Sequence, residues 1–178
     1  MIYIILGNGF EEMEALTPCD ILRRCGAEVQ LVGIGPVVTG GHGITVQADI
    51  TVEQMDLRAA DMIVLPGGLG GVQSIGECQV AMDAIKAAYE AGKYVAAICA
   101  GPTLLARLGI TDGKRVTSYP GTQSQMGSAV HTAQPTELDG RIITGEAAGS
   151  AVAFGLKLAE VLCGEDTARR VADAIIIR

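Results

Sequence analysis

Basic residues and histidines are scarce in this sequence of 178 residues, and their scarcity excludes several classes of partner. Lys and Arg together number 13 against 20 Asp and Glu, which gives a formal net charge of -7. Such a chain repels phosphate backbones and anionic lipid surfaces, so we expect neither nucleic acid nor a membrane as a partner. The two histidines, His42 and His131, lie far apart in the sequence. We therefore expect no metal site.

The sequence also lacks long apolar runs and paired cysteines. No uninterrupted apolar stretch approaches the length of about 18 residues that a membrane span needs, and the first six residues lack the basic segment of a signal peptide. The cysteines are odd in number and none shows Cys-x-x-Cys spacing: Cys19, Cys25, Cys78, Cys99 and Cys163. This pattern disfavours a disulfide scaffold and a thiolate zinc site. We expect a cytoplasmic protein with reduced cysteines.

Short apolar runs alternate along the chain with helical patterns. The runs cover residues 2–6, 28–34, 44–47, 62–65, 94–98, 115–119 and 141–144. The helical patterns cover residues 11–25, 80–91, 102–108, 148–163 and 166–175. The strongest runs are continuous rather than alternating in polarity, which is typical of strands buried on both faces of a parallel sheet. We predict one domain over residues 1–178, folded as a doubly wound α/β sandwich.

Two residue types predict where the helices end. Glycines follow four of the helical patterns, at the usual C-cap position. They are Gly26, Gly92, Gly109 and Gly164. Pro18 falls inside the first pattern and predicts a kink or a break there.

Segments whose residues can react or bind ligands follow four of the predicted strands. They are an acidic cluster, a glycine-rich loop, a thiol and a phenol: residues 11–14, residues 66–71, Cys99 and Tyr119. Open α/β sheets bind ligands beyond the carboxyl ends of their strands. We therefore expect these four segments to converge on one edge of the sheet.

Cys99 is the most distinctive of these residues. It lies at a strand-to-helix junction, and Gly101 and Pro102 follow it, as at the first turn of a helix. The arrangement resembles a nucleophile elbow with cysteine in place of serine. A thiol at a helix N-terminus faces the positive end of the helix dipole, which predicts a lowered pKa and a reactive thiolate. The alternative is an inert cysteine packed as a small hydrophobic residue. The other four cysteines are interpreted as packing residues, with Cys78 partly exposed.

Glu14 is the candidate acid/base partner of Cys99. It lies three residues after Glu11, so it can face the crevice. A carboxyl group beside a thiolate tends to stay protonated and can move protons. Glu11 and Glu12 are interpreted as complements of the helix dipole.

The remaining candidates each have two interpretations. The loop with Gly67 and Gly68 is either a plain turn or a backbone that offers N–H groups as an oxyanion hole. Tyr119 either donates a proton or lines the pocket. His42, in a probable loop, is either solvated or lines the site, and His131 is interpreted as structural.

Three segments resemble the DJ-1/ThiJ/PfpI superfamily in order and spacing, particularly its bacterial ThiJ-like branch. They are Glu-Glu-Met-Glu at residues 11–14, Leu-Pro-Gly-Gly at 65–68 and Ala-Ala-Ile-Cys-Ala-Gly-Pro at 96–102. The resemblance extends over nearly the whole chain. It implies a flavodoxin-like three-layer α/β/α sandwich with a mainly parallel central sheet, usually in a homodimer. It also implies that Cys99 is the reactive, easily oxidised cysteine, that Glu14 is its partner carboxyl group, and that Gly68 and Ala100 supply nearby backbone N–H groups.

The resemblance also implies a class of function. Relatives are described as cofactor-free glyoxalases that convert 2-oxoaldehydes to 2-hydroxy acids, as deglycases, and as oxidative-stress sensors or chaperones. We therefore expect an enzyme that acts on a small aldehyde or ketone without a cofactor, with redox sensing through Cys99 as the alternative. A cysteine peptidase is a further alternative, although that branch has His after the nucleophile where this chain has Ala100.

The sequence departs from the family pattern at three positions. Tyr119 stands where relatives often have His, His42 lies near the region of an anion-binding Arg, and Glu146 stands where many relatives have a second Arg. An acidic pocket poor in Arg binds anionic substrates less well. The departures keep open a third alternative, a pocket that has lost its activity.

Overall fold

Seven strands form the central sheet of the computed structural model, which describes residues 1–177. Their order across the sheet is β10-β11-β7-β6-β1-β2-β5. Their bounds are β1 (Ile2–Leu6), β2 (Val29–Gly33), β5 (Ile50–Thr51), β6 (Met62–Leu65), β7 (Tyr94–Ile98), β10 (Thr136–Asp139) and β11 (Ile142–Gly145). All of them run parallel except β10, which pairs antiparallel with β11 at one edge. The predicted mainly parallel sheet is confirmed.

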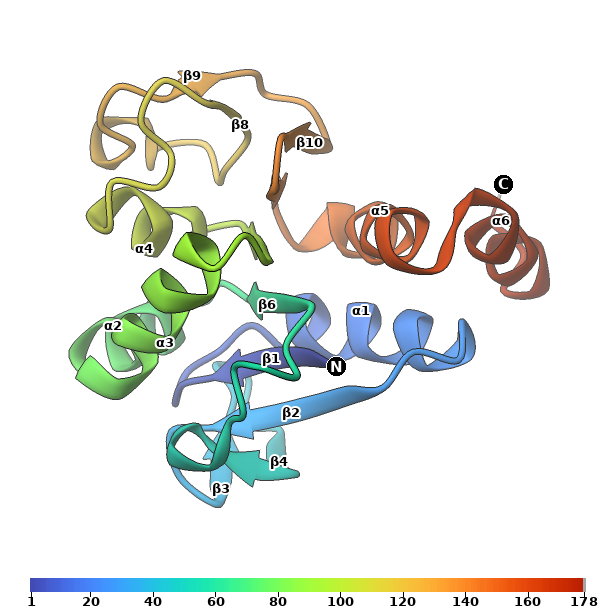
Figure 1. Cartoon of the computed structure of the whole chain (residues 1–178), viewed down its shortest axis with the longest axis horizontal. Helices are drawn as coiled ribbons and strands as arrows, with labels where there is room; N and C mark the ends of the chain where they lie inside the picture. The colour runs from blue at the N-terminus through green and yellow to red at the C-terminus, as the bar shows by residue number, and fades with distance from the viewer. Residues whose placement is uncertain (178) are drawn as a thin grey trace.

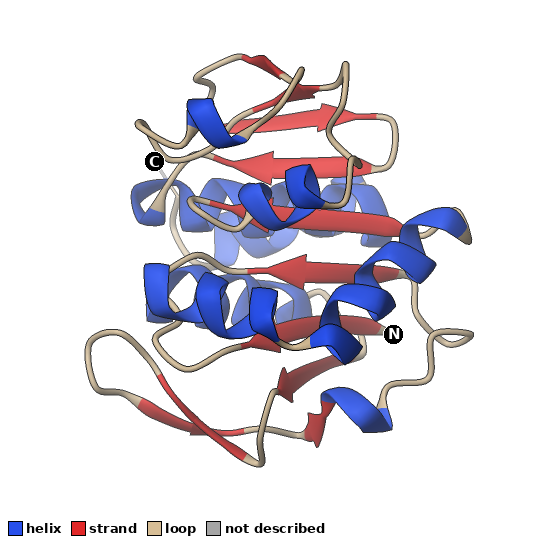
Figure 2. Cartoon of the chain, turned by 90° about the vertical axis from the view of Figure 1, so that its left-hand side faces the viewer, coloured by secondary structure: helices blue, strands red, loops and turns tan. Residues whose placement is uncertain are grey.

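Helices cover both faces of this sheet and complete the predicted three-layer sandwich (Figure 1, Figure 2). One face carries α1 (Glu12–Arg24), α5 (Ala151–Cys163) and α6 (Glu165–Ala174), and the other carries α2 (Leu69–Glu77), α3 (Gln79–Glu90) and α4 (Pro102–Arg107). Each face has its own apolar cluster. Ile4 is buried in one cluster and its neighbour Ile5 in the other, because successive side chains of a strand point to opposite faces. Burial on both faces explains why β1 reads as a continuous apolar run.

Two small ladders lie outside the central sheet. The β3–β4 hairpin pairs Val37–Thr39 with Thr45–Gln47, and β8 (Arg115–Val116) pairs with β9 (Val130–His131). The predicted strand at 115–119 is therefore too long. Its ladder stops because the Thr117 N–H donates to Thr144 Oγ1 at 2.9 Å and the Ser118 N–H donates to His131 Nε2 at 3.2 Å. Short 3-10 turns cover Val52–Gln54, Gln123–Gln125 and Ala148–Ser150.

The predicted helix ends agree with the structure, and of the kink or break predicted at Pro18 the break does not occur. Positive φ angles of 70° to 88° mark the four predicted C-cap glycines: Gly26, Gly92, Gly109 and Gly164. Helix α1 runs without interruption through Pro18. Among residues 1–177, no helix combines the length and apolarity that crossing a lipid bilayer requires.

Helix α2 begins inside the segment that the sequence marks as a glycine-rich loop, so that assignment is wrong for residues 69–71. Glycine lowers helix propensity, but tertiary packing overrides it here. A Cβ at Gly71 would lie 2.6 Å from the Cα of Phe10, and one at Gly70 would lie 3.1 Å from the Asn8 carbonyl oxygen. The glycines thus allow the first turn of α2 to approach the backbone that follows β1.

Candidate active site

Cys99 occupies a tight turn between β7 and α4, at the carboxyl edge of the sheet. Its φ of 65° lies in the left-handed region, which residues with a Cβ rarely adopt. The turn is held by the Cys99 N–H, which donates to the Gly145 carbonyl at 3.0 Å, and by the Cys99 carbonyl, which accepts from the Tyr119 N–H at 2.8 Å. A Cβ at Gly101 would lie 2.6 Å from the Leu65 carbonyl oxygen. The backbone therefore has the predicted elbow geometry.

Glu14 is buried in the first turn of α1 and forms a pair with Cys99. Its Oε2 accepts a hydrogen bond from the Gly67 N–H at 2.7 Å, and a Cβ at Gly67 would touch both this oxygen and the Cys99 Cβ, so the carboxyl group lies beside the thiol. Its Oε1 has no hydrogen-bond partner within residues 1–177. A carboxyl group this poorly solvated favours the protonated state, which suits it to proton transfer.

Two backbone N–H groups point at the sulfur. Those of Gly68 and Ala100 lie close enough to the sulfur to favour its thiolate and lower its pKa. Gly68 has a φ of 83°, a conformation that glycine adopts without strain. Of the two interpretations of this loop, the geometry fits a backbone that offers N–H groups to a reacting centre.

The protonation of the pair follows from its burial. Burial, aided by the charge of Glu11, raises the pKa of Glu14 to about 7. Burial, the Glu14 charge and the hydrogen bond to Glu14 raise the pKa of Cys99 to about 12, against the N–H groups of Ala100 and Gly68. The lowered pKa predicted for Cys99 from its helix N-terminus is therefore wrong, because desolvation and the adjacent carboxylate outweigh two N–H donors. Between these pH values the pair shares one proton.

Cys99 lines a cavity of about 260 Å³, and Glu14 lies buried behind it. Its lining residues are Glu11, Gly68, Leu69, Cys99, Ala100, Tyr119 and Thr122. Leu69 and Tyr119 are 83% and 51% exposed, so they form the outer rim. Of the predicted site residues, the structure brings together Cys99, Glu14, Gly67, Gly68, Ala100 and Tyr119. Leu69 and Thr122 were not predicted, because no motif distinguishes them from other apolar and hydroxyl residues.

A hydrogen-bonded chain supports the Tyr119 side of the cavity. Ser118 Oγ lies 2.8 Å from Thr122 Oγ1 and 3.1 Å from His131 Nε2. Thr122 Oγ1 donates to the Tyr119 carbonyl at 2.8 Å. His131, interpreted from the sequence as structural, thus helps to fix the loop that carries Tyr119.

His42 lies beside the rim, outside the residues that line the cavity. Its Nδ1 is 2.9 Å from Glu12 Oε2 and 3.5 Å from Glu11 Oε2, and its N–H donates to Glu12 Oε1 at 2.7 Å. Burial opposes the ionisation of Glu12, but hydrogen bonds from His42 and from backbone N–H groups prevail and lower its pKa to about 2. Glu12, interpreted as a dipole complement, instead anchors the β3–β4 hairpin to α1.

The same three side chains are spaced as metal ligands would be. The ligand atoms of Glu11, Glu12 and His42 all lie within 4.8 Å of one another. Both Glu12 oxygens already accept hydrogen bonds from the His42 loop. The donor set therefore fits an ion pair better than a cation site.

We expect Gly67→Ala to destabilise the protein by about 1–3 kcal/mol, because overpacking strains a filled site. The added Cβ would lie 2.6 Å from Glu14 Oε2 and 2.8 Å from the Cys99 Cβ. Urea denaturation measures the change in the free energy of unfolding. Gly149→Ala is the matched control, since no heavy atom lies within 4 Å of its Cβ position. Equal stability of the two variants would contradict the close packing around Gly67.

Known proteins resemble this chain in both sequence and structure. The model of the DJ-1/PfpI family matches residues 1–161. Protein dj-1beta of Drosophila melanogaster is 35% identical over 178 residues, which cover 98% of this chain and 95% of that protein. Its crystal structure matches with a TM-score of 0.93 at 36% identity, over 99% of this chain and 97% of that chain.

Two further relatives have informative descriptions. A structure of oxidized DJ-1 from Toxoplasma gondii has a TM-score of 0.93 at 30% identity, over 98% of this chain and 97% of that chain. A deglycase of Pyrococcus abyssi is 35% identical over 126 residues, which cover 70% of this chain and 75% of that protein.

Proposed function

The chain belongs to the DJ-1/PfpI family, and we propose that it is a cofactor-independent enzyme in which Cys99 and Glu14 act on small reactive carbonyl compounds. The proposal rests on the adjacent Cys99 and Glu14 side chains, with the sulfur at the wall of a cavity that Gly68 and Ala100 also line. The description of the Pyrococcus abyssi relative as a deglycase supports the same class of chemistry.

The volume and the lining residues of the cavity favour a small, uncharged substrate. Its volume of about 260 Å³ suits a molecule of a few heavy atoms, and Leu69 and Tyr119 give it an apolar rim. Glu11 is the charged residue in its lining, and no Arg or Lys is among the lining residues. We therefore propose a 2-oxoaldehyde such as methylglyoxal rather than a phosphorylated or carboxylated carbonyl compound.

The reaction begins with the formation of a carbon–sulfur bond. The Cys99 sulfur adds to the aldehyde carbon as its proton passes to the Glu14 carboxylate, and the carbonyl π electrons move to oxygen. Preorganised N–H groups stabilise such an oxyanion strongly in a site with little water, and Gly68 and Ala100, which lie beside the sulfur, would supply them. Glu14 then returns the proton to that oxygen, which completes a hemithioacetal.

The second step moves electrons within the substrate. Glu14 removes the proton from the aldehyde carbon and delivers it to the neighbouring carbonyl carbon through an enediol, while the hydroxyl proton of the hemithioacetal passes to the neighbouring carbonyl oxygen. The first carbon is thereby oxidised to a thioester and the second is reduced to an alcohol, so no external oxidant or reductant is required. Water hydrolyses the thioester, which releases a 2-hydroxy acid and restores the Cys99 thiol.

The pH dependence of turnover should reflect Glu14. Below about pH 7 both members of the pair hold a proton and no base is available, so kcat/KM should fall about tenfold per pH unit. Above about pH 7 it should level off, because the second proton stays until about pH 12. Lactate formation from methylglyoxal measures the profile.

Glu11→Gln is the control for this assignment. The charge of Glu11 raises the pKa of Glu14, so its removal should move the rising limb to lower pH. A profile that stays flat between about pH 5 and pH 9, or a limb that Glu11→Gln leaves in place, would contradict the role of Glu14.

Redox sensing through Cys99 is the second candidate function, favoured by the relative solved in an oxidized form. Two equivalents of peroxide convert a thiol to a sulfinic acid with the release of two waters, and a protonated Glu14 can donate a hydrogen bond to the product. Absence of methylglyoxal turnover in the wild type, together with a gain of about 32 Da on Cys99 in peroxide, would favour this alternative.

A further inference from the structure

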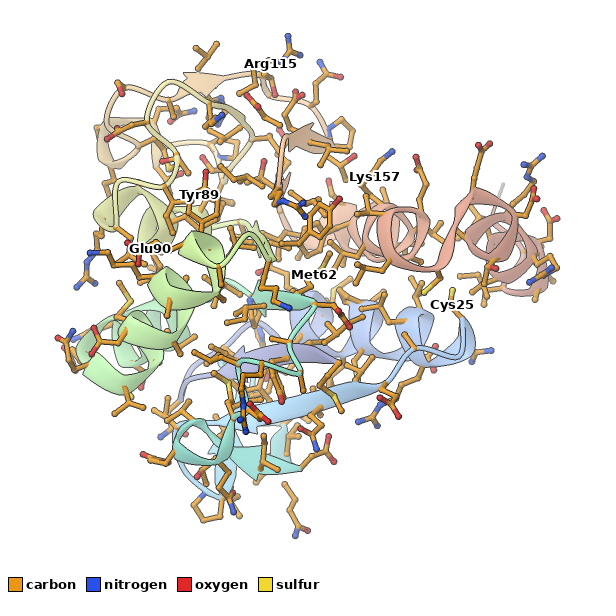
Figure 3. All side chains as sticks on the ribbon, in the orientation of Figure 1. Cys25, Met62, Tyr89, Glu90, Arg115 and Lys157 are labelled. Carbon is orange, nitrogen blue, oxygen red and sulfur yellow. The ribbon has the colours of Figure 1, made fainter. Side chains whose placement is uncertain are left out.

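Two cysteines far apart in the sequence meet at the edge of the sheet opposite to Cys99. Cys25 caps the C-terminal end of α1, and Cys163 is the last residue of α5. Both helices follow strands of the parallel sheet and lie on the same face, so they point the same way (Figure 1). Figure 3 shows Cys25 at the end of α1, near the junction of α5 and α6.

Close packing of α1 against α5 keeps these helix ends together. A Cβ at Gly155 of α5 would lie 3.0 Å from the Cα of Pro18 and 2.9 Å from Cδ1 of Ile21. About two turns of α5 and one to two turns of α1 separate this contact from the two cysteines. At the helix ends Cys25 and Cys163 lie close enough for each thiol to influence the pKa of the other, and both line the same cavity.

Both thiols line a cavity that admits small molecules. It has a volume of about 560 Å³, and its wall includes Glu28 and Asp61 in addition to the two cysteines. Both cysteines are partly buried rather than enclosed. Burial raises the pKa of each thiol, while Arg170 on α6 acts against this rise at Cys25. The pair is therefore reachable by an oxidant, and it reacts more slowly than a thiolate would.

We propose that Cys25 and Cys163 form a redox-active pair that closes to an intramolecular disulfide when the protein meets a hydroperoxide. Either thiol can react first, and the steps are equivalent in the two orders; in one of them the sulfur of Cys163 attacks the peroxide. Its S–O bond forms as the O–O bond breaks and hydroxide leaves, which gives a sulfenic acid. The Cys25 sulfur then displaces the hydroxyl group as water. In sum, two thiols and one hydrogen peroxide give one disulfide and two waters.

The disulfide would tie the first helix of the chain to the last long one. A cross-link between residues 25 and 163 closes most of the chain into a loop and removes conformational freedom from the unfolded state. We expect the oxidised form to unfold at a Tm about 5–15 °C above that of the reduced form. This pair and Cys99 lie at opposite edges of the sheet, so the inference stands or falls separately from the proposed enzyme.

Peptide mapping after peroxide treatment tests the inference. The full chain with Cys99→Ser, which removes the competing thiol, is treated with hydrogen peroxide, alkylated and digested without reductant. We expect a linked peptide that joins Cys25 to Cys163, a mass lower by about 2 Da and reversal by dithiothreitol. Adding Cys25→Ser or Cys163→Ser should abolish the link and the rise in Tm, whereas Cys78→Ser, the matched control, should leave both unchanged.

Three outcomes would overturn the inference, and none of them needs a variant at either position of the pair. One is that both thiols stay fully alkylatable in peroxide. Another is that Cys25 is linked to another cysteine or to a second chain. The third is that the linked form melts at the same Tm as the reduced form.

Discussion

Replacing Cys99 with serine should lower kcat/KM for methylglyoxal by at least about 10³-fold, the size of effect seen when a covalent nucleophile is removed. A serine hydroxyl is a far weaker nucleophile than a thiol, and Glu14 cannot ionise it near neutral pH. Lactate formation from methylglyoxal, followed at about pH 8 with the wild type alongside, measures the loss.

Two controls isolate the reacting sulfur. Cys78→Ser removes a partly buried thiol that lies between α2 and α3, outside the cavity, and should leave turnover unchanged. The fold of Cys99→Ser should persist, because serine can occupy the same left-handed turn. Equal rates for the wild type and Cys99→Ser would end the claim that Cys99 acts as the nucleophile.

Glu14→Gln should have two large effects of opposite sign. The first is on turnover, which we expect to fall by about 10²–10⁴-fold, because the amide cannot accept the thiol proton or move a proton between carbons. The Gly67 N–H keeps an acceptor in the amide oxygen, so the loss reflects proton transfer rather than a displaced loop.

The second effect of Glu14→Gln is on stability. The folded protein raises the pKa of Glu14 from 4.5 to about 7, so its contribution to stability is fully present below about pH 4.5 and is lost as the pH rises through 7. Since each unit of pKa corresponds to 1.36 kcal/mol, ionised Glu14 destabilises the fold by about 3 kcal/mol at pH 8. Glutamine has no charge to bury, and the variant should be more stable than the wild type by a similar amount.

Urea denaturation at about pH 4.5 and about pH 8 checks the sign of this difference in stability between Glu14→Gln and the wild type. The two proteins should differ little at the lower pH and clearly at the higher one. Glu90→Gln, which replaces an exposed carboxylate on α3, serves as the matched control and should show a small difference at both. If Glu14→Gln is instead less stable at pH 8, then the buried carboxylate is held by more favourable contacts than those described above.

The parts of the fold that the sequence predicts well are those buried on both faces. Strands β6 and β7 begin and end at the predicted residues, because their apolar runs have no exposed face to interrupt them. Helix α2 was missed because glycine is a weak helix former, and the sequence alone does not show that Phe10 and Asn8 require small neighbours. The Glu12–His42 pair was missed because the two residues are 30 positions apart.

The candidate site was predicted in its composition but not in its electrostatics. The pattern of segments after strands placed Cys99, Glu14 and Gly68 at one edge, because the carboxyl ends of parallel strands meet there. It did not predict how much water the fold would remove from the sulfur and the carboxyl group. That quantity depends on the packing of several segments at once, and it reversed the expected direction of the pKa shift of Cys99.

Positions behind the cavity and positions at its entrance tolerate substitution to different degrees. Behind the cavity, Gly67 has no room for a side chain between the Glu14 oxygen and the Cys99 Cβ, so mutation there disturbs folding and chemistry together. At the entrance, the outward-facing Leu69 and Tyr119 can be exchanged with little effect on the packed interior. Substitutions at these two positions can therefore change the substrate preference while the reacting groups stay the same.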